Sequence, residues 1–174
     1  MPQVMEVEAG QAERCDRPRP LDRTAEVAGS QQRTLTPFGA IVVIGSEIVG
    51  EGTSSVVELR DPTAHAEVMA LRHAGSNLER HLFEDGVMYA SSEPCPMCLM
   101  ACYWARIPRL IFGASSHDVA TYGFEDLQFY REIAQPIDRR SLREDLAEGT
   151  LRAQAIEVLR AWAGKLPEPV VPKF

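Results

Sequence analysis

Apolar and polar positions along the chain follow two periods in turn, which predicts strands that alternate with helices. The stretch "PFGAIVVIGSEIVGEG" contains an apolar run, Phe38 to Ile44, a Gly-Ser turn and a second run, Glu47 to Gly52. This order predicts a β-hairpin. Two further strands are predicted at Gly86 to Ser92 and in "RLIFGAS", Arg109 to Ser115.

Helical segments are predicted between and after these strands. After the break at "RDP", Thr63 can N-cap a helix whose apolar face includes Val68 and Leu71. A second helix is predicted from Cys95 to Ala105, because Pro96 is tolerated in a first turn. Strands that alternate with helices predict an α/β layered fold with a mixed sheet. Other helices are predicted at Leu21 to Gln32, Asp126 to Ile133 and Leu151 to Ala163.

The two ends of the chain lack such periodicity. Residues 1–20 are polar, contain proline and predict a mobile tail. Residues 165–174 include "LPEPVVPKF", whose prolines predict an extended arm. We therefore expect one domain over residues 21–164, within which the segment "SLREDLAEG" remains ambiguous.

Composition narrows the possible partners. A chain of 174 residues with 45% hydrophobic residues is long enough for one domain with a core. Its net charge of −7 is unfavourable for binding nucleic acid or an anionic membrane. The sequence has no secretory h-region at its start and no apolar run near the roughly 20 residues that span a bilayer. We expect a cytoplasmic protein without a nucleic-acid or membrane partner.

Two helix starts carry residues that suit a metal. Cys95 and Cys98 are one turn apart on the same helical face, so both sulfurs can reach one ion. His65 can supply a third ligand from the start of the preceding helix. Three protein ligands leave a fourth position open, which is typical of a catalytic zinc site.

Glu67 is two residues from His65 and points beside the metal instead of at it. A carboxylate there can take a proton from water on the metal and return it to a substrate. A lone CxxC also fits a redox motif, and a lone H-x-E fits a solvated helix start. Together, however, H-A-E and P-C-x-x-C on successive helices form the signature of zinc deaminases.

Four stretches carry a resemblance to a known family: "PFGAIV", "DPTAHAE", "SSEPCPMCLMACYWAR" and "YGFEDLQFYREI". The chain resembles the cytidine/deoxycytidylate deaminase superfamily and, within it, the bacterial guanine deaminases. The resemblance implies a three-layer α-β-α sandwich with a five-stranded mixed sheet, whose fifth strand would lie within Ser141 to Leu146. It implies bound Zn2+, a small nucleobase substrate, and a homodimer in which the C-terminal arm closes the partner's active site.

The resemblance also implies roles for individual residues. Asp126 matches a second proton-handling group, although it could instead be a solvated N-cap of its helix. The Ala66 N–H would bind a substrate acceptor, and the Ser92 carbonyl would lie near the leaving amine. Phe38 and Trp104 are candidate pocket walls, with core packing as the alternative.

Two positions depart from the guanine deaminase pattern. Ser54 stands where that pattern has an asparagine that binds the purine, and Phe174 stands where it has a tyrosine. A hydroxyl cannot replace the paired donor and acceptor of an amide. We therefore expect a preference shifted from guanine towards an isoguanine, azapyrimidine or aminotriazine type of substrate. The alternatives are a cytosine, cytidine or guanosine deaminase, a tRNA adenosine deaminase, and a non-catalytic zinc-stabilised fold.

Overall fold

The structure is a computed structural model that describes residues 20–29 and 36–168. The chain separates into two compact units, residues 1–131 and residues 132–174. The first unit contains the sheet and most helices, and the second contains a short 3-10 helix, η1 (Ile137–Arg139), and helix α7 (Gly149–Ala163). Most of the predicted N-terminal tail and the last part of the predicted arm lie outside the described residues.

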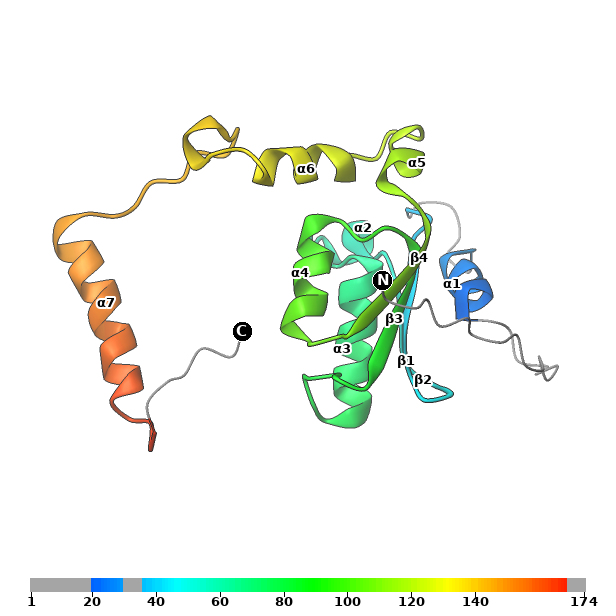
Figure 1. Ribbon diagram of the computed structural model, residues 1–174, viewed down its shortest axis with the longest axis horizontal. Coiled ribbons are helices and arrows are strands. Elements are labelled where there is room, and N and C mark those ends of the chain that lie inside the picture. Colours follow the sequence, from blue (N-terminus) through cyan, green and yellow to red (C-terminus); the bar gives the residue numbers. More distant parts are fainter. Residues whose placement is uncertain (1–19, 30–35, 169–174) are drawn as a thin grey trace, which may run out of the picture. The chain divides into compact units, whose positions relative to one another are not determined.

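A four-stranded mixed sheet forms the centre of the first unit (Figure 1). Its order is β2 (Glu47–Thr53), β1 (Gly39–Ile44), β3 (Gly86–Ser92) and β4 (Arg109–Ala114). β1 is antiparallel to β2 and β3, whereas β3 and β4 are parallel. The predicted hairpin, both later strands and the mixed sheet are confirmed.

Helices cover both faces of this sheet, so the first unit has three layers. One face packs Val27 of α1 (Pro20–Gly29) against Ile41 and Val43. The other face packs Ala40, Val42, Met88 and Ala90 against α3 (Ala66–Leu78) and α4 (Pro96–Trp104). Successive strand residues point to opposite faces, which is why alternate positions of β1 belong to different layers.

The predicted fifth strand is wrong for the described residues. Residues 141–148 form no strand, and Leu142 and Leu146 are 73% and 74% exposed. Three of the six residues from Ser141 to Leu146 are charged, and charged side chains favour neither a strand nor a buried sheet face. β4 is consequently an edge strand within the described chain.

Other differences concern short elements. The N-cap of α3 is His65, not Thr63, whose hydroxyl instead donates to the Asp61 carboxylate at 2.6 Å. Pattern analysis missed two helices of four and five residues, because such lengths are too short to show a helical period. They are α2 (Val56–Leu59) and α5 (Ser116–Ala120), which precedes α6 (Asp126–Ile133).

Helix α3 lies unusually close to strand β2. A Cβ atom built on Gly52 would stand 2.2 Å from the Ala66 carbonyl oxygen, and one on Gly50 would stand 2.3 Å from the Ala70 carbonyl oxygen. Only hydrogen fits at either position. Because Ala66 opens α3, the Gly52 contact fixes where the first turn of that helix begins.

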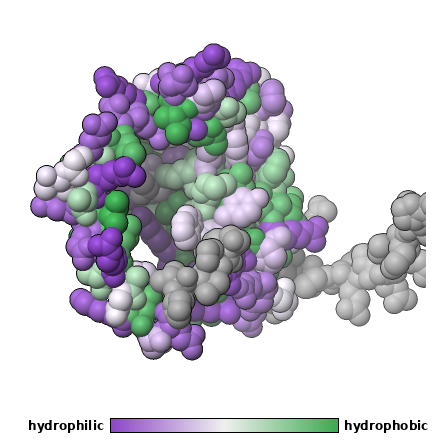
Figure 2. Space-filling model, turned by 60° about the vertical axis from the view of Figure 1, so that its left-hand side comes forward, coloured by the Kyte–Doolittle hydropathy of each residue, from purple (hydrophilic) through white to green (hydrophobic). Residues whose placement is uncertain are grey.

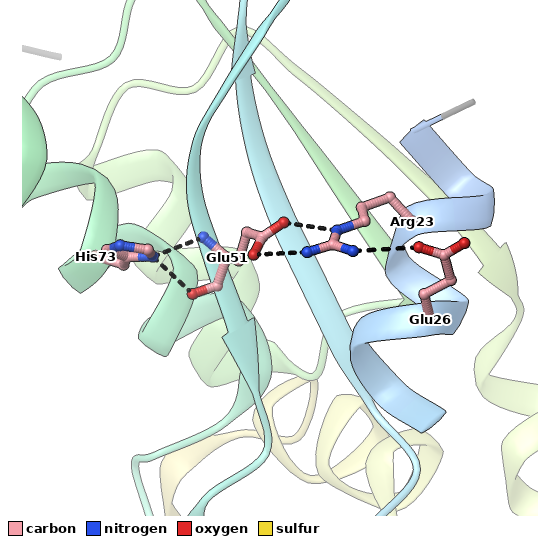
Figure 3. A network of polar contacts seen from close by, with 4 residues as sticks. All are labelled: Arg23, Glu26, Glu51 and His73. Carbon is pink, nitrogen blue, oxygen red and sulfur yellow. Dashed lines mark hydrogen bonds and ion pairs between the residues drawn. The ribbon is translucent and has the colours of Figure 1, made fainter. Parts of the chain in front are cut away.

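Polar contacts reinforce the layers around β2 (Figure 3). Arg23 of α1 donates to both carboxylate oxygens of Glu51, at 2.7 and 3.1 Å. From the other face, His73 Nδ1 accepts from the Glu51 N–H at 3.1 Å, and the Asn77 amide donates to the Val49 carbonyl at 2.9 Å. These α3 side chains occupy backbone groups on the open edge of β2, which would otherwise be free to pair with another strand.

No helix in the described part of the chain combines the length and the apolar character that crossing a bilayer requires.

Gly52→Ala tests the close approach of α3 to β2. We expect the free energy of unfolding to fall by about 3 kcal/mol, since the added methyl group collides with backbone that cannot move aside without separating helix and strand. The matched control is Gly75→Ala, where the new Cβ would be 3.2 Å from the Arg80 carbonyl oxygen and the change should be within about 1 kcal/mol. Urea denaturation measures both, and equal effects would contradict the explanation.

Candidate active site

Two helix N-termini carry the candidate metal ligands. His65 is the N-cap residue of α3 and Cys95 that of α4, and both have extended backbone angles. Neither side chain caps its own helix. Ser, Thr, Asp and Asn are the usual N-caps and stabilise a helix by about 1 kcal/mol. The sequence forgoes that stabilisation at both positions, which indicates that these side chains serve another purpose.

The three predicted ligands meet at one point. The ligand atoms of His65, Cys95 and Cys98 all lie within 4.8 Å of one another. Cys95 Sγ is 3.6 Å from His65 Nδ1. Two ligands of a tetrahedral zinc ion lie roughly 3.6 Å apart, given zinc–ligand distances of about 2.0–2.3 Å. The donor set, two sulfurs and one imidazole nitrogen, therefore fits zinc in chemistry and in spacing.

The short distances between the three ligands shift the pKa values of Cys95 and His65. The Cys98 thiol hydrogen-bonds to Cys95 and lowers the Cys95 pKa to about 4. The Cys95 sulfur in turn raises the pKa of His65. The positive ends of two helix dipoles add to the preference for a thiolate at this point.

Glu67 lies beside the ligands and is 6% exposed. Burial raises the pKa of its carboxyl group above the usual range. A raised pKa makes a carboxylate a stronger proton acceptor than it is in water, which suits a general acid/base. Glu67 is not one of the three grouped ligands, so its carboxylate remains available for that exchange.

These residues border a cavity of about 210 Å³ in the first unit. Of the predicted site residues, it is lined by His65, Cys95, Glu67, Asp126, Ser54, Ala66, Ser92 and Phe38. Cys98, the third ligand, is fully buried and is not among the lining residues. Sequence positions from 38 to 126 thus converge on one cavity.

Asp126 enters the cavity from the first turn of α6. It is half-buried, and its pKa is raised, mainly by burial and then by the nearby Cys95 charge. Such surroundings differ from those of a solvated N-cap. The cavity therefore has two carboxyl groups with raised pKa values, those of Glu67 and Asp126.

Ser54 follows the end of β2 and is 5% exposed. Its backbone N–H donates to the Phe38 carbonyl oxygen at 3.1 Å, so the hairpin holds both residues at the same wall. The Phe38 ring meets Phe124 edge to face, with centroids 4.7 Å apart.

Besides Cys98, two predicted residues are not among those that line the cavity within the described chain. Trp104 ends α4 and is 75% exposed. Phe174 lies outside the described residues.

Sequence reasoning missed five residues of the cavity wall. Val56 and Val57 belong to the short helix α2, which shows no periodic signal. Phe124 and Glu93 stand inside recognised motifs and could have been noted there, whereas nothing local marks Thr36. The full set is Thr36, Val56, Val57, Glu93 and Phe124.

Comparison with known proteins agrees with this geometry. Residues 21–114 match the family described as the cytidine and deoxycytidylate deaminase zinc-binding region. A guanine deaminase of Bacillus subtilis is 47% identical over 107 residues, which is 61% of this chain and 68% of that protein. The X-ray structure of guanine deaminase from Bacillus subtilis superposes with a TM-score of 0.78 at 35% identity, covering 87% of this chain and 96% of the other.

A second kind of relative also matches. A tRNA-specific adenosine deaminase of Buchnera aphidicola is 45% identical over 90 residues, which is 52% of this chain and 60% of that protein. From the family match and the guanine deaminase relatives, we conclude that this chain belongs to the cytidine and deoxycytidylate deaminase zinc-binding family and is a guanine deaminase-like hydrolytic deaminase.

Proposed function

We propose that the protein deaminates a free nucleobase or a related amino-heterocycle, with a preference shifted away from guanine. The observation that carries the proposal is a cavity lined by His65, Cys95 and Glu67 together with Ser54. Ser54 stands where the guanine deaminase pattern has an asparagine. The substrate would lose its exocyclic amine as ammonia and gain a carbonyl oxygen from water.

The charges around the cavity support an unphosphorylated substrate. Its ionisable side chains include the carboxylates Glu67, Glu93 and Asp126, and no lysine or arginine lines it within the described chain. A phosphate group would meet these carboxylates here, with no lysine or arginine side chain to bind it. This favours a neutral ring with N–H and amino donors over a nucleotide.

The protein's residues divide the reaction between them. Zinc held by His65, Cys95 and Cys98 would lower the pKa of water towards roughly 7 and so supply hydroxide at neutral pH. Glu67 takes a proton from the attacking water and delivers it to the ring nitrogen next to the reacting carbon. Asp126 handles the second proton, which leaves with the amine.

Backbone groups would orient the ring. Ala66 is the first residue of α3, and no carbonyl one turn earlier can bond its N–H within the helix, so this N–H suits a substrate acceptor. The Ser92 carbonyl at the end of β3 suits the leaving amine as an acceptor. The His65 ring and Phe38 offer flat or apolar surface to the base.

We also propose a homodimer in which the C-terminal arm reaches the partner's site. Exposed apolar side chains support self-association: Tyr103 and Met100 of α4, and Leu159 and Trp162 of α7 are 47–66% exposed. Figure 2 shows hydrophobic residues interspersed among hydrophilic ones on the face it draws.

Sedimentation velocity tests the proposed homodimer. It should return twice the mass of one chain, and a monomer at micromolar concentration would refute the homodimer.

Glu67→Gln tests the acid/base role. The amide keeps the shape but cannot transfer the proton, so we expect kcat/KM for ammonia release to fall about 100-fold to 10,000-fold. Zinc content should stay at that of the unaltered protein, because Glu67 is not a ligand. Glu47→Gln is the control, because Glu47 is exposed on β2 and is not among the residues that line the cavity. Undiminished turnover by Glu67→Gln would refute the role.

Ser54→Asn tests the substrate preference. Ammonia release is measured for the unaltered protein and for the variant with a panel of substrates: guanine, isoguanine, cytosine, an aminotriazine, guanosine, deoxycytidylate and a tRNA anticodon stem-loop. We expect a free base other than guanine to be the best substrate of the unaltered protein. Ser54→Asn should raise kcat/KM for guanine relative to that base about tenfold or more, because a restored buried hydrogen bond is worth about 1–3 kcal/mol.

The panel also separates the alternatives. Ser76→Asn on the exposed side of α3 is the matched control and should leave the order of substrates unchanged. Guanine turned over orders of magnitude faster than every other base would refute the shifted preference. Turnover of the stem-loop alone would favour the tRNA adenosine deaminase alternative, which the 45% identical relative makes worth testing.

A further inference from the structure

Helix α6 carries Asp126 into the cavity, yet it has little packing to hold it. None of its eight residues is buried, and Phe129 and Ile133 are 49% and 53% exposed. A helix normally owes its position to an apolar face that packs against the core. The position of Asp126 must therefore depend on other contacts of α6 or of its neighbours.

Two contacts flank Asp126. Two residues before it, the Phe124 ring meets Phe38 edge to face. Four residues after it, the Tyr130 hydroxyl donates to the Pro94 carbonyl oxygen at 2.7 Å. Burial raises the pKa of Tyr130 to about 12, so its phenol remains a donor throughout the neutral range.

Pro94 is a firm attachment point. Its side chain is fully buried, and it directly precedes the metal ligand Cys95. The neighbouring Glu93 is held twice, since its N–H donates to the Ala114 carbonyl at 2.7 Å and its carboxylate accepts from the Ser116 N–H at 2.7 Å. The loop that Tyr130 contacts is thus fixed to the end of β4 and to α5.

Helix geometry links this hydrogen bond to Asp126. Residues i and i+4 lie on one face of a helix, so Tyr130 and Asp126 point to the same side of α6. We call residues 93–95, between β3 and α4, the metal-binding loop. A hydrogen bond from Tyr130 to this loop sets both the rotation of α6 and its distance from the loop. Loss of the bond would let the Asp126 carboxylate turn or withdraw from the cavity.

We propose that Tyr130 is a positioning residue that holds Asp126 at the substrate by joining α6 to the Pro94 carbonyl of the metal-binding loop. The inference rests on the proposed function of Asp126 as a proton-handling group. It assigns no contact with substrate to Tyr130, which acts through the helix. A displacement of about 1 Å in such a group can lower a rate about 100-fold.

The test is a double-mutant cycle of Tyr130→Phe and Asp126→Asn, measured as ammonia release from the best substrate. Tyr130→Phe should lower kcat about tenfold or more, while its zinc content stays unchanged. In the Asp126→Asn background the same exchange should change kcat less than twofold, because the group that Tyr130 positions is already disabled. Amide hydrogen exchange across residues 126–133 should be faster in Tyr130→Phe.

Tyr122→Phe is the matched control, because Tyr122 is 83% exposed and lies outside the cavity described above. It should change neither kcat nor exchange in α6. Equal effects of Tyr130→Phe in both backgrounds, or loss of zinc from Tyr130→Phe, would overturn the inference. An Asp126→Asn variant with full activity would instead refute the proposed function of Asp126, so the two failures can be told apart.

Discussion

The close contact of α3 with β2 is the constraint on which the site depends. Gly52 leaves room for the Ala66 carbonyl, and this fixes the start of the helix whose first turn carries His65 and Glu67. The parallel pairing of β3 with β4 fixes the second helix start, because α4 is the connection between them. The donor atoms of His65, Cys95 and Cys98 then meet without any long side-chain reach, so little conformational entropy is lost in assembling them.

The site also shows where stability is given up for chemistry. His65 and Cys95 occupy N-cap positions without capping, and Glu67 is a buried carboxyl group. Each choice costs stability, by about 1 kcal/mol for a missing cap and by more for taking a carboxyl group out of water. A cation at the ligands would offset part of this cost, since it binds the folded arrangement and not the unfolded chain.

The sequence predicted best what short-range patterns control. The hairpin from Gly39 to Thr53, the two later strands and the H-A-E and P-C-x-x-C helices all show clear periods or motifs. The expected fifth strand is missing from the described residues, where three consecutive charged residues separate Leu142 from Leu146 and both leucines are exposed. Residues of the cavity wall such as Val57 and Phe124 belong to short or irregular segments, where only tertiary contacts decide which residues meet.

The most direct test of the account is zinc-edge X-ray absorption of the purified protein. Three protein ligands with one open position predict one zinc per chain, bound by two sulfurs at about 2.3 Å and by two lighter atoms at about 2.0–2.1 Å. One lighter atom would be the imidazole nitrogen of His65, and the other would come from solvent. A shell of four protein ligands, or protein that binds no zinc, would contradict the claim that this cavity is a catalytic metal site.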